Sequence, residues 1–268
     1  MKLFKRSNYK LYIIVIVSLI IFALSLLDPL FGVNHFMNII NYSGAKLSNL
    51  DIINNFHEWG ILCENNFILI IVPIFSALII YIVDYENKIV TMIRYKNRNS
   101  IWGNKVSLVI GVAFLVSFIL VFGGYLISGI FVKGYDNLWT TNLGIPYSIF
   151  GDTDKWLNLQ GLLVTYKVLI ILWTKIFLGL SFIGVTLCTF QLFMNNVFVY
   201  LGVIISVVLE GTRLVSLCIV RLVTFPKNWV NPKSFILDDL FYLIGFIVLF
   251  LIGRYINCKR DQGIDKKY

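Results

Sequence analysis

Charged residues are scarce in this sequence. Only 14% of its residues are charged, 58% are hydrophobic, and its mean hydropathy is +0.82. A water-soluble domain needs more polar side chains than this to cover its surface, so a soluble globular fold is excluded. The chain is therefore predicted to be an integral membrane protein.

Histidine and cysteine are too few or too dispersed for the common metal and redox motifs. The sequence has two histidines and four cysteines, with no CxxC pair. Both histidines precede the second long apolar run, so no two imidazoles are available within the apolar runs to ligate haem. One group is close in sequence, but its spacing matches no ligand template. That group comprises His57, Glu58, Cys63 and Glu64. No metal or other cofactor is predicted for this chain.

The sequence also contains no GxxxxGK[ST] phosphate loop. Such loops hold the phosphates of ATP with backbone N–H groups and a lysine. The chain is therefore not expected to hold ATP in this way, and if ATP drives it, ATP and Mg²⁺ are expected on a separate ATPase chain. The HExxH zinc-protease motif is absent as well, and the chain is expected to be a non-catalytic membrane subunit. The net charge is +9, but the positive residues separate apolar runs and form no single basic face. Membrane lipid, not nucleic acid, is the expected partner of these charges.

Long apolar runs dominate what is present. A helix needs about 20 mainly apolar residues to cross the hydrocarbon. On that template the fold class is all-α, a single polytopic membrane domain over residues 1–268 with about six transmembrane helices. The predicted spans are 11–27, 67–83, 106–131, 168–194, 197–220 and 240–256. Glu210 and Arg213 interrupt the fifth span, and because they are three residues apart on a helix, they are expected to pair.

The distribution of basic residues predicts the orientation of the chain. Segments rich in Lys and Arg stay in the cytoplasm. With an inside N-terminus, 14 of the 23 basic residues lie on the cytoplasmic side. Both termini are therefore predicted inside, with outer loops at about 28–66 and 133–167 and an interrupted outer segment at 210–239. Lys175, seven residues into the fourth span, is expected to extend its ammonium group to the outer interface.

One predicted inner loop, residues 84–105, carries seven charged residues. On a helical wheel it has an apolar stripe of Tyr85, Ile89, Met92 and Ile93, and a charged side of Glu86, Arg94 and Arg98. The segment is predicted to be an amphipathic helix at the membrane surface. Ser100 is expected to cap the next helix, and Trp102 to lie at the membrane interface. A loop that only contacts anionic lipid would explain the basic residues but not Glu86 or the apolar stripe.

The order of residues in this loop resembles the inner loop of ABC transporter permeases of the type-2 exporter class. An acidic residue precedes an amphipathic helix, basic residues follow, and an aromatic residue and a lysine open the third span. The matching residues are Glu86, Arg94, Arg98, Trp102 and Lys105. The family's usual Gly-Thr pair after the acidic residue is absent. The layout of six spans, inside termini and a long first outer loop is also similar, and it covers most of the chain.

The resemblance implies a permease subunit of an ATP-driven exporter in a bacterial plasma membrane. It implies that residues 84–105 dock onto a cytoplasmic ATPase subunit, that a second permease chain, identical or related, completes the complex, and that residues 210–225 form re-entrant outer helices. The expected substrate is an amphipathic peptide or a lipid-like compound. Two other functions stay open, namely a non-transporting immunity protein that binds a bacteriocin-like peptide and an ion-coupled secondary transporter.

Overall fold

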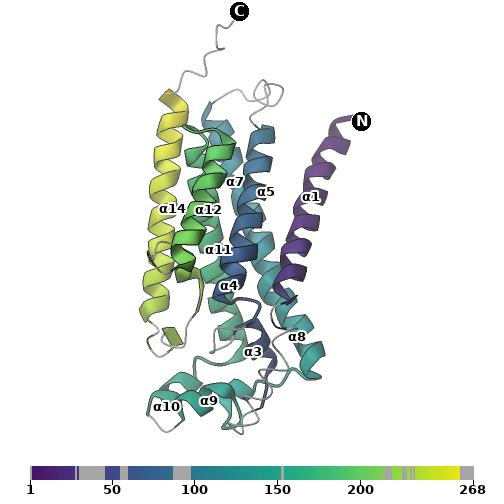
Figure 1. Ribbon diagram of the computed structural model, residues 1–268, viewed down its shortest axis with the longest axis vertical. Coiled ribbons are helices and arrows are strands. Elements are labelled where there is room, and N and C mark those ends of the chain that lie inside the picture. Colours follow the sequence, from purple (N-terminus) through teal and green to yellow (C-terminus); the bar gives the residue numbers. More distant parts are fainter. Residues whose placement is uncertain are drawn as a thin grey trace, which may run out of the picture.

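The protein is a bundle of helices. The computed structural model describes residues 2–27, 29, 46–54, 60–86, 98–151, 154–212, 214, 219–224, 228–229, 231 and 233–259. Most of these residues are helical, and none of them forms a strand. Figure 1 shows the long helices side by side, with shorter helices gathered at one end. The all-α prediction is confirmed.

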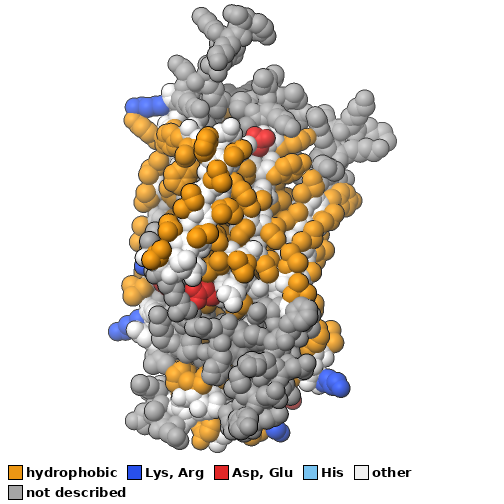
Figure 2. All heavy atoms as spheres, viewed as in Figure 1, with side chains coloured by type: hydrophobic (Ala, Val, Ile, Leu, Met, Phe, Trp, Pro, Cys, Tyr) orange, Lys and Arg blue, Asp and Glu red, His pale blue; other side chains and the backbone are white. Residues whose placement is uncertain are grey.

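Four helices are long and apolar enough to cross a membrane. They are Glu64–Tyr85, Ser100–Val132, Thr165–Phe190 and Lys233–Lys259. Two shorter apolar helices, Leu11–Ser25 and Asn196–Gly211, accompany them. Figure 2 shows a broad band of apolar side chains over the long helices, with charged side chains near its edges and beyond. These features indicate a membrane protein, and the count of six spans stays a prediction.

Two of the long helices are built from more than one element. In chain order the bundle consists of α1 (Lys2–Ser25), α4 (Glu64–Asn66) with η1 (Phe67–Ile71) and α5 (Val72–Glu86), α7 (Arg98–Phe118) with η2 (Ile119–Gly123) and α8 (Gly124–Val132), α11 (Thr165–Phe190), α12 (Asn196–Gly211) and α14 (Lys233–Lys259). The elements η1 and η2 are single π-helical turns that interrupt otherwise continuous α-helices.

The centre of the bundle is α11, which packs along α14, α7 and α5. Its backbone approaches its neighbours closely because it carries glycines at the contacts. A Cβ atom on Gly184 would overlap Val109, and one on Gly179 would overlap Leu222. Within their apolar stretches, 56% of α11 is buried but only 11% of α14. Most of the surface of α14 is therefore available to lipid or to another chain.

Several predicted span boundaries differ from the observed helices, and the fifth and sixth spans differ in ways that matter for the site. The fifth apolar helix ends at Gly211 and not at residue 220 as predicted. Directly after this end, the hydroxyl of Thr212 donates a hydrogen bond of 3.0 Å to the carbonyl oxygen of Val208. The sixth begins at Lys233 instead of residue 240. In the predicted re-entrant segment, the described residues 219–224 contain one 3-10 turn, η4 (Val220–Leu222). Re-entrant helices stay a prediction.

The described parts of the two predicted outer loops fold together as a cap, at the end of the bundle opposite the start of α1 and the end of α14 (Figure 1). The described part of this cap contains α3 (Asn49–Ile53), η3 (Leu138–Thr140), α9 (Ile145–Phe150) and α10 (Asp154–Gln160). The indole Nε1 of Trp139 donates a hydrogen bond of 2.6 Å to Oδ1 of Asp51. The backbone N–H of Lys46 donates one of 2.7 Å to the carbonyl oxygen of Leu143. The cap is thus held by contacts between segments far apart in the sequence.

Asp51 is a fully buried carboxyl group within this cap. Its Oδ2 accepts a hydrogen bond of 2.7 Å from the backbone N–H of Ser48, as part of the capping box of α3. Burial raises the pKa of Asp51 from 3.8 to about 7, although the hydrogen bonds from Ser48 and Trp139 act in the opposite direction. The folded protein therefore holds a proton on this group at pH values where the unfolded chain has lost it.

Because of this raised pKa, folding takes up a proton between about pH 4 and pH 7. The stability that this group contributes is greatest below this range, falls as the pH rises through it, and is constant above it. We expect the thermal midpoint in detergent, followed by tryptophan fluorescence, to decrease between about pH 4 and about pH 7, and to decrease less in Asp51→Asn. Asp136→Asn, at an exposed acid of the same cap, should keep the wild-type profile. An identical pH dependence in Asp51→Asn and the wild type would contradict the raised pKa.

Candidate functional site

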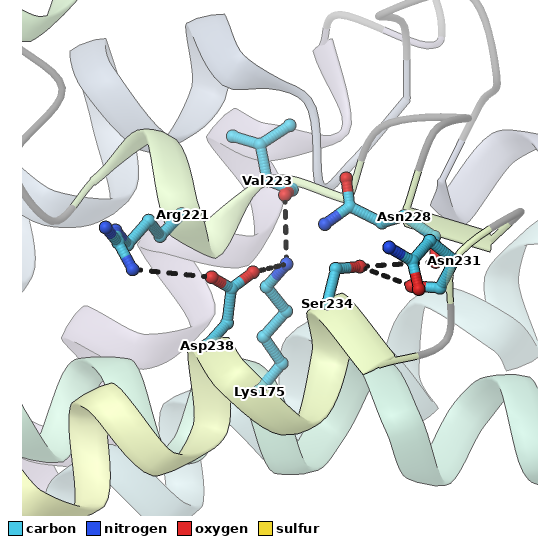
Figure 3. A network of polar contacts seen from close by, with 7 residues as sticks. All are labelled: Lys175, Arg221, Val223, Asn228, Asn231, Ser234 and Asp238. Atoms are coloured by element: carbon cyan, nitrogen blue, oxygen red, sulfur yellow. Dashed lines mark hydrogen bonds and ion pairs between the residues drawn. The ribbon is translucent and has the colours of Figure 1, made fainter.

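A buried network of charged groups joins three elements near the cap (Figure 3). The ammonium group of Lys175 on α11 lies 3.2 Å from Oδ2 of Asp238 on α14. It also donates a hydrogen bond of 3.1 Å to the carbonyl oxygen of Val223, which follows η4. Arg221 of η4 lies 3.7 Å from the other carboxylate oxygen of Asp238. Asp238 thus faces two cations, and the network connects α11, α14 and the η4 segment.

Lys175 is the most buried member of this network, with 1% of its side chain exposed, compared with 15% for Asp238 and 40% for Arg221. An unpaired cation at this position would lose its hydration without compensation. The carboxylate of Asp238, the carbonyl of Val223 and the ring of Phe235, 5.5 Å away, compensate it instead. The prediction that Lys175 extends to the interface is wrong, because a carboxylate from another helix meets it inside the bundle.

Asp238 and Asp239 are the site residues that sequence reasoning missed. The hydropathy template began the sixth span at residue 240 and placed both outside it. Since α14 begins at Lys233, both lie inside a helix of membrane-spanning length. The sequence feature that could have identified them is an acidic pair directly before a long apolar run, together with a lysine inside another apolar run.

The first turns of α14 are fixed beside the network. The hydroxyl of Ser234 donates to the carbonyl oxygen of Asn231 (2.7 Å) and lies 3.4 Å from that of Asn228 (Figure 3). The guanidinium of Arg221 lies over the ring of Phe241, 4.5 Å from its centroid. These contacts hold α14 in the register at which Asp238 faces α11.

Aromatic side chains connect the network to the outer cap. The ring of Phe235, beside Lys175, packs against Trp229 with ring centroids 5.1 Å apart. Trp229 in turn meets Trp139 edge-on at 5.9 Å. Trp139 donates its indole N–H to Asp51. A continuous chain of contacts therefore runs from the ion pair within the bundle to the buried carboxyl of the cap.

The residues predicted to dock an ATPase are only partly described. Arg94 and the side chains of Glu86 and Arg98 lie outside the described part of the chain. Trp102 and Lys105 are described, and their side chains are buried, with 1% and 4% exposed. Ser100 was predicted to cap this helix, but α7 already begins at Arg98, so Ser100 lies within its first turn. The docking role of this segment stays a prediction.

Trp102 joins α7 to α14, and its side chain is buried between the two helices. Its indole Nε1 donates a hydrogen bond of 3.0 Å to the carbonyl oxygen of Phe250. The ring lies against Gly253, where a Cβ atom would overlap it. The glycine on α14 gives the ring a place between the helices, and the position of Trp102 at the membrane interface stays a prediction. Any contribution of its side chain to docking is to position the start of α7.

Asp84, the first acidic residue of segment 84–105, also bonds within the bundle. Its Oδ1 accepts a hydrogen bond of 2.9 Å from Nδ2 of Asn196. Oδ1 of Asn196 accepts one of 2.9 Å from Nε2 of Gln191. These bonds connect the ends of α5 and α11 to the start of α12, where the partial positive charge of the helix N-terminus favours a carboxylate. Asp84 therefore stabilises helix packing at this end.

Glu210 is buried near the end of α12, with 1% of its surface exposed. Its predicted partner, Arg213, lies outside the described residues, so the pair stays a prediction. Of the sequence cluster considered for a metal, only Cys63 and Glu64 are described. Within the described part of the chain, no group of three or more His, Cys, Asp and Glu side chains could hold a metal ion.

Comparison with known proteins identifies no family for this chain. No protein-family model, curated protein or solved structure matches this chain. Its function therefore has to be inferred from its own residues. The features that carry the inference are the membrane-length helices, the buried network around Lys175 and Asp238, and the contact of Trp102 with α14.

Proposed function

We propose that this chain is the transmembrane permease subunit of an ATP-driven ABC exporter in a bacterial plasma membrane. ATP is hydrolysed by a separate ATPase subunit, a second permease chain, identical or related, completes the complex, and the exported compound is an amphipathic peptide or lipid-like. One observation supports this proposal most. The end of α5 and the start of α7, which flank the charged segment 84–105, lie at the same end of the bundle as the start of α1 and the end of α14 (Figure 1). In the sequence, 14 of the 23 basic residues fall at or next to these four helix ends, as expected of segments that stay in the cytoplasm.

An ATPase bound at this end would act on the centre of the bundle. Both α5 and α7 pack against α11, so a displacement of their ends changes the packing of α11. Trp102 bonds the start of α7 to α14. Near the cap, Lys175 bonds α11 to α14 and to the η4 segment. Rigid connections at both ends suit a helix bundle that transmits a movement from an ATPase to the opposite face.

The docking role predicts that removing charges from segment 84–105 releases the ATPase. Glu86→Ala, Arg94→Ala and Arg98→Ala are combined in one tagged variant, which is purified from membranes. We expect co-purification of a chain that carries a phosphate loop to fall by at least about tenfold, or about 1.4 kcal/mol. The physical reason is the loss of charge-assisted contacts with the ATPase surface.

A matched variant removes the same number and sign of charges from the opposite end. It combines Lys46→Ala, Asp136→Ala and Lys167→Ala, and it should retain the ATPase. The thermal midpoints of both variants in detergent are compared with the wild type, so that unfolding is distinguished from release. Docking through this segment is wrong if the variant lacking Glu86, Arg94 and Arg98 still binds the ATPase at the wild-type level.

The charged network favours a second candidate, an ion-coupled secondary transporter. Acidic residues within a membrane-spanning helix are where such transporters bind protons or cations, and Asp238 and Asp239 both lie in α14. This candidate requires transport to stop when the proton and sodium gradients are collapsed and to continue without an ATPase. Transport that survives the collapse and requires ATP supports the exporter.

A further inference from the structure

An open groove lies between the turn that joins α11 to α12, at residues 191–195, and the last turns of α14. Figure 1 shows this turn and the end of α14 at the same end of the bundle. The groove has a volume of about 470 Å³, and the described residues that line it are Leu192, Phe193, Tyr255, Ile256 and Lys259. Phe193 and Tyr255 are 63% and 60% exposed, so the groove opens to the outside of the bundle.

The groove continues into the apolar surface of α14. Of its described lining side chains, all except Lys259 are aliphatic or aromatic. Ile252 and Val248 lie one and two turns before Ile256 on the same side of the helix, and they are 43% and 47% exposed. An acyl chain that starts in the groove can therefore lie along α14 toward the middle of the bundle, against a continuous apolar surface.

The groove also carries a positive charge. Among its described lining residues, only Lys259 is charged. Its ammonium group lies 4.5 Å from the centroid of the Tyr255 ring, one turn earlier on α14, and this contact holds it beside the groove. The ion pairs between described residues do not involve Lys259. The carbonyl groups at the end of α14 carry only about half a negative charge, so the positive charge of the lysine exceeds it.

We propose that this groove binds an anionic phospholipid, with the phosphate group beside Lys259 and an acyl chain along Ile252 and Val248. The ammonium group attracts the phosphate, and the apolar walls remove the chain from water. The exposed ring of Tyr255 lies between the two, which suits the boundary between headgroups and hydrocarbon, where tyrosine is favoured.

A free phosphate ion would use the cation but leave the apolar walls without a partner, so the groove is assigned to a lipid. The assignment requires only that the chain lies in a membrane. It does not depend on export or on an ATPase, so it is measured on the full-length chain alone.

The test compares two lipids that carry a diazirine at the same position of one acyl chain. One is phosphatidylglycerol, which is anionic, and the other is phosphatidylcholine, which has no net charge. Each is added to the full-length chain in nanodiscs of unlabelled phosphatidylcholine and photolysed, and labelled peptides are identified by mass spectrometry. We expect phosphatidylglycerol to label residues 248–259 about fivefold more than phosphatidylcholine. Unlabelled phosphatidylglycerol should compete, whereas inorganic phosphate should not.

Two pairs of variants locate the site. Lys259→Gln removes the charge and should abolish the fivefold preference, whereas Arg254→Gln removes an exposed charge of the same helix that does not line the groove, and should keep it. Phe193→Ala removes part of the wall and should reduce labelling by both lipids at least about threefold. Phe198→Ala, at a residue 59% exposed outside this groove, should keep the labelling. All four side chains are exposed, and thermal midpoints in detergent confirm that the variants are folded.

Labelling that is equal for the two lipids, or for which unlabelled phosphatidylglycerol does not compete, would show that the end of α14 contacts only bulk lipid and would overturn the proposal. A preference that survives Lys259→Gln would overturn the placement of the phosphate group. Competition by inorganic phosphate would show that the site takes a free anion and would overturn the assignment of a lipid. None of these results concerns the binding of an ATPase, so failure of this site is distinguishable from failure of the proposed function.

Discussion

Asp238→Asn is expected to lower the free energy of unfolding by about 3 kcal/mol, because it leaves the buried cation of Lys175 without its carboxylate partner. Breaking a buried ion pair costs about 3–5 kcal/mol. The low end applies here because Asp239 also exerts a favourable electrostatic effect on Lys175. The measurement is unfolding of the purified protein in mixed micelles by added denaturing detergent. Asp136→Asn, on the surface of the cap, should change stability by less than about 0.5 kcal/mol.

Lys175→Met is expected to cost less than Asp238→Asn. The carboxylate that it leaves behind is 15% exposed and still has Arg221 at 3.7 Å. The double variant Lys175→Met/Asp238→Asn should be more stable than Asp238→Asn alone, because no unpaired buried cation remains. If the two losses simply added in the double variant, the two residues would not be acting as a pair.

Trp102→Ala is expected to lower the free energy of unfolding by about 3–5 kcal/mol, as truncation of a buried aromatic side chain does. The ring is 1% exposed and fills the space between α7 and α14 at Gly253. Its N–H also satisfies the carbonyl oxygen of Phe250. The variant therefore loses the contact that holds the start of α7 against α14. The same detergent unfolding measurement gives the change in free energy.

Gly253→Ala tests this contact from the other helix. The added methyl group would overlap the indole, so we expect a loss of about 1–3 kcal/mol from overpacking. In the Trp102→Ala background the methyl group has room, so the combined loss should be smaller than the sum of the two. Gly111→Ala, which has open space, should be neutral or slightly stabilising because alanine is the better helix former. A combined loss equal to the sum would contradict a direct contact between Trp102 and Gly253.

The long helices could be predicted from the sequence because crossing a bilayer constrains length and composition together. Their ends could not always be predicted, because polar residues continue a helix when their partners lie on other elements. Lys233, Asp238 and Asp239 lower the local hydropathy, yet α14 runs through them. The partner of Asp238 is Lys175, in a different apolar run, and no local pattern reveals that pairing.

The candidate site was less predictable because its contacts join distant parts of the chain. Trp102 bonds to a carbonyl group 148 residues later, and Trp139 bonds to a carboxyl group 88 residues earlier. Tryptophan is favoured at membrane interfaces, but that preference does not predict that the ring of Trp102 packs between helices against Gly253. The backbone hydrogen bonds of each helix join residues that are close in sequence. The positions of these two tryptophan side chains instead depend on how the helices pack.

The most direct measurement is purification of the tagged full-length chain from its native membranes in mild detergent, with identification of bound proteins by mass spectrometry. An ATP-driven permease subunit predicts a bound chain that contains a GxxxxGK[ST] phosphate loop, together with ATP hydrolysis by the purified complex. The contradicting result is a chain purified without any such partner, from cells whose transport or protection continues after every candidate ATPase has been disabled.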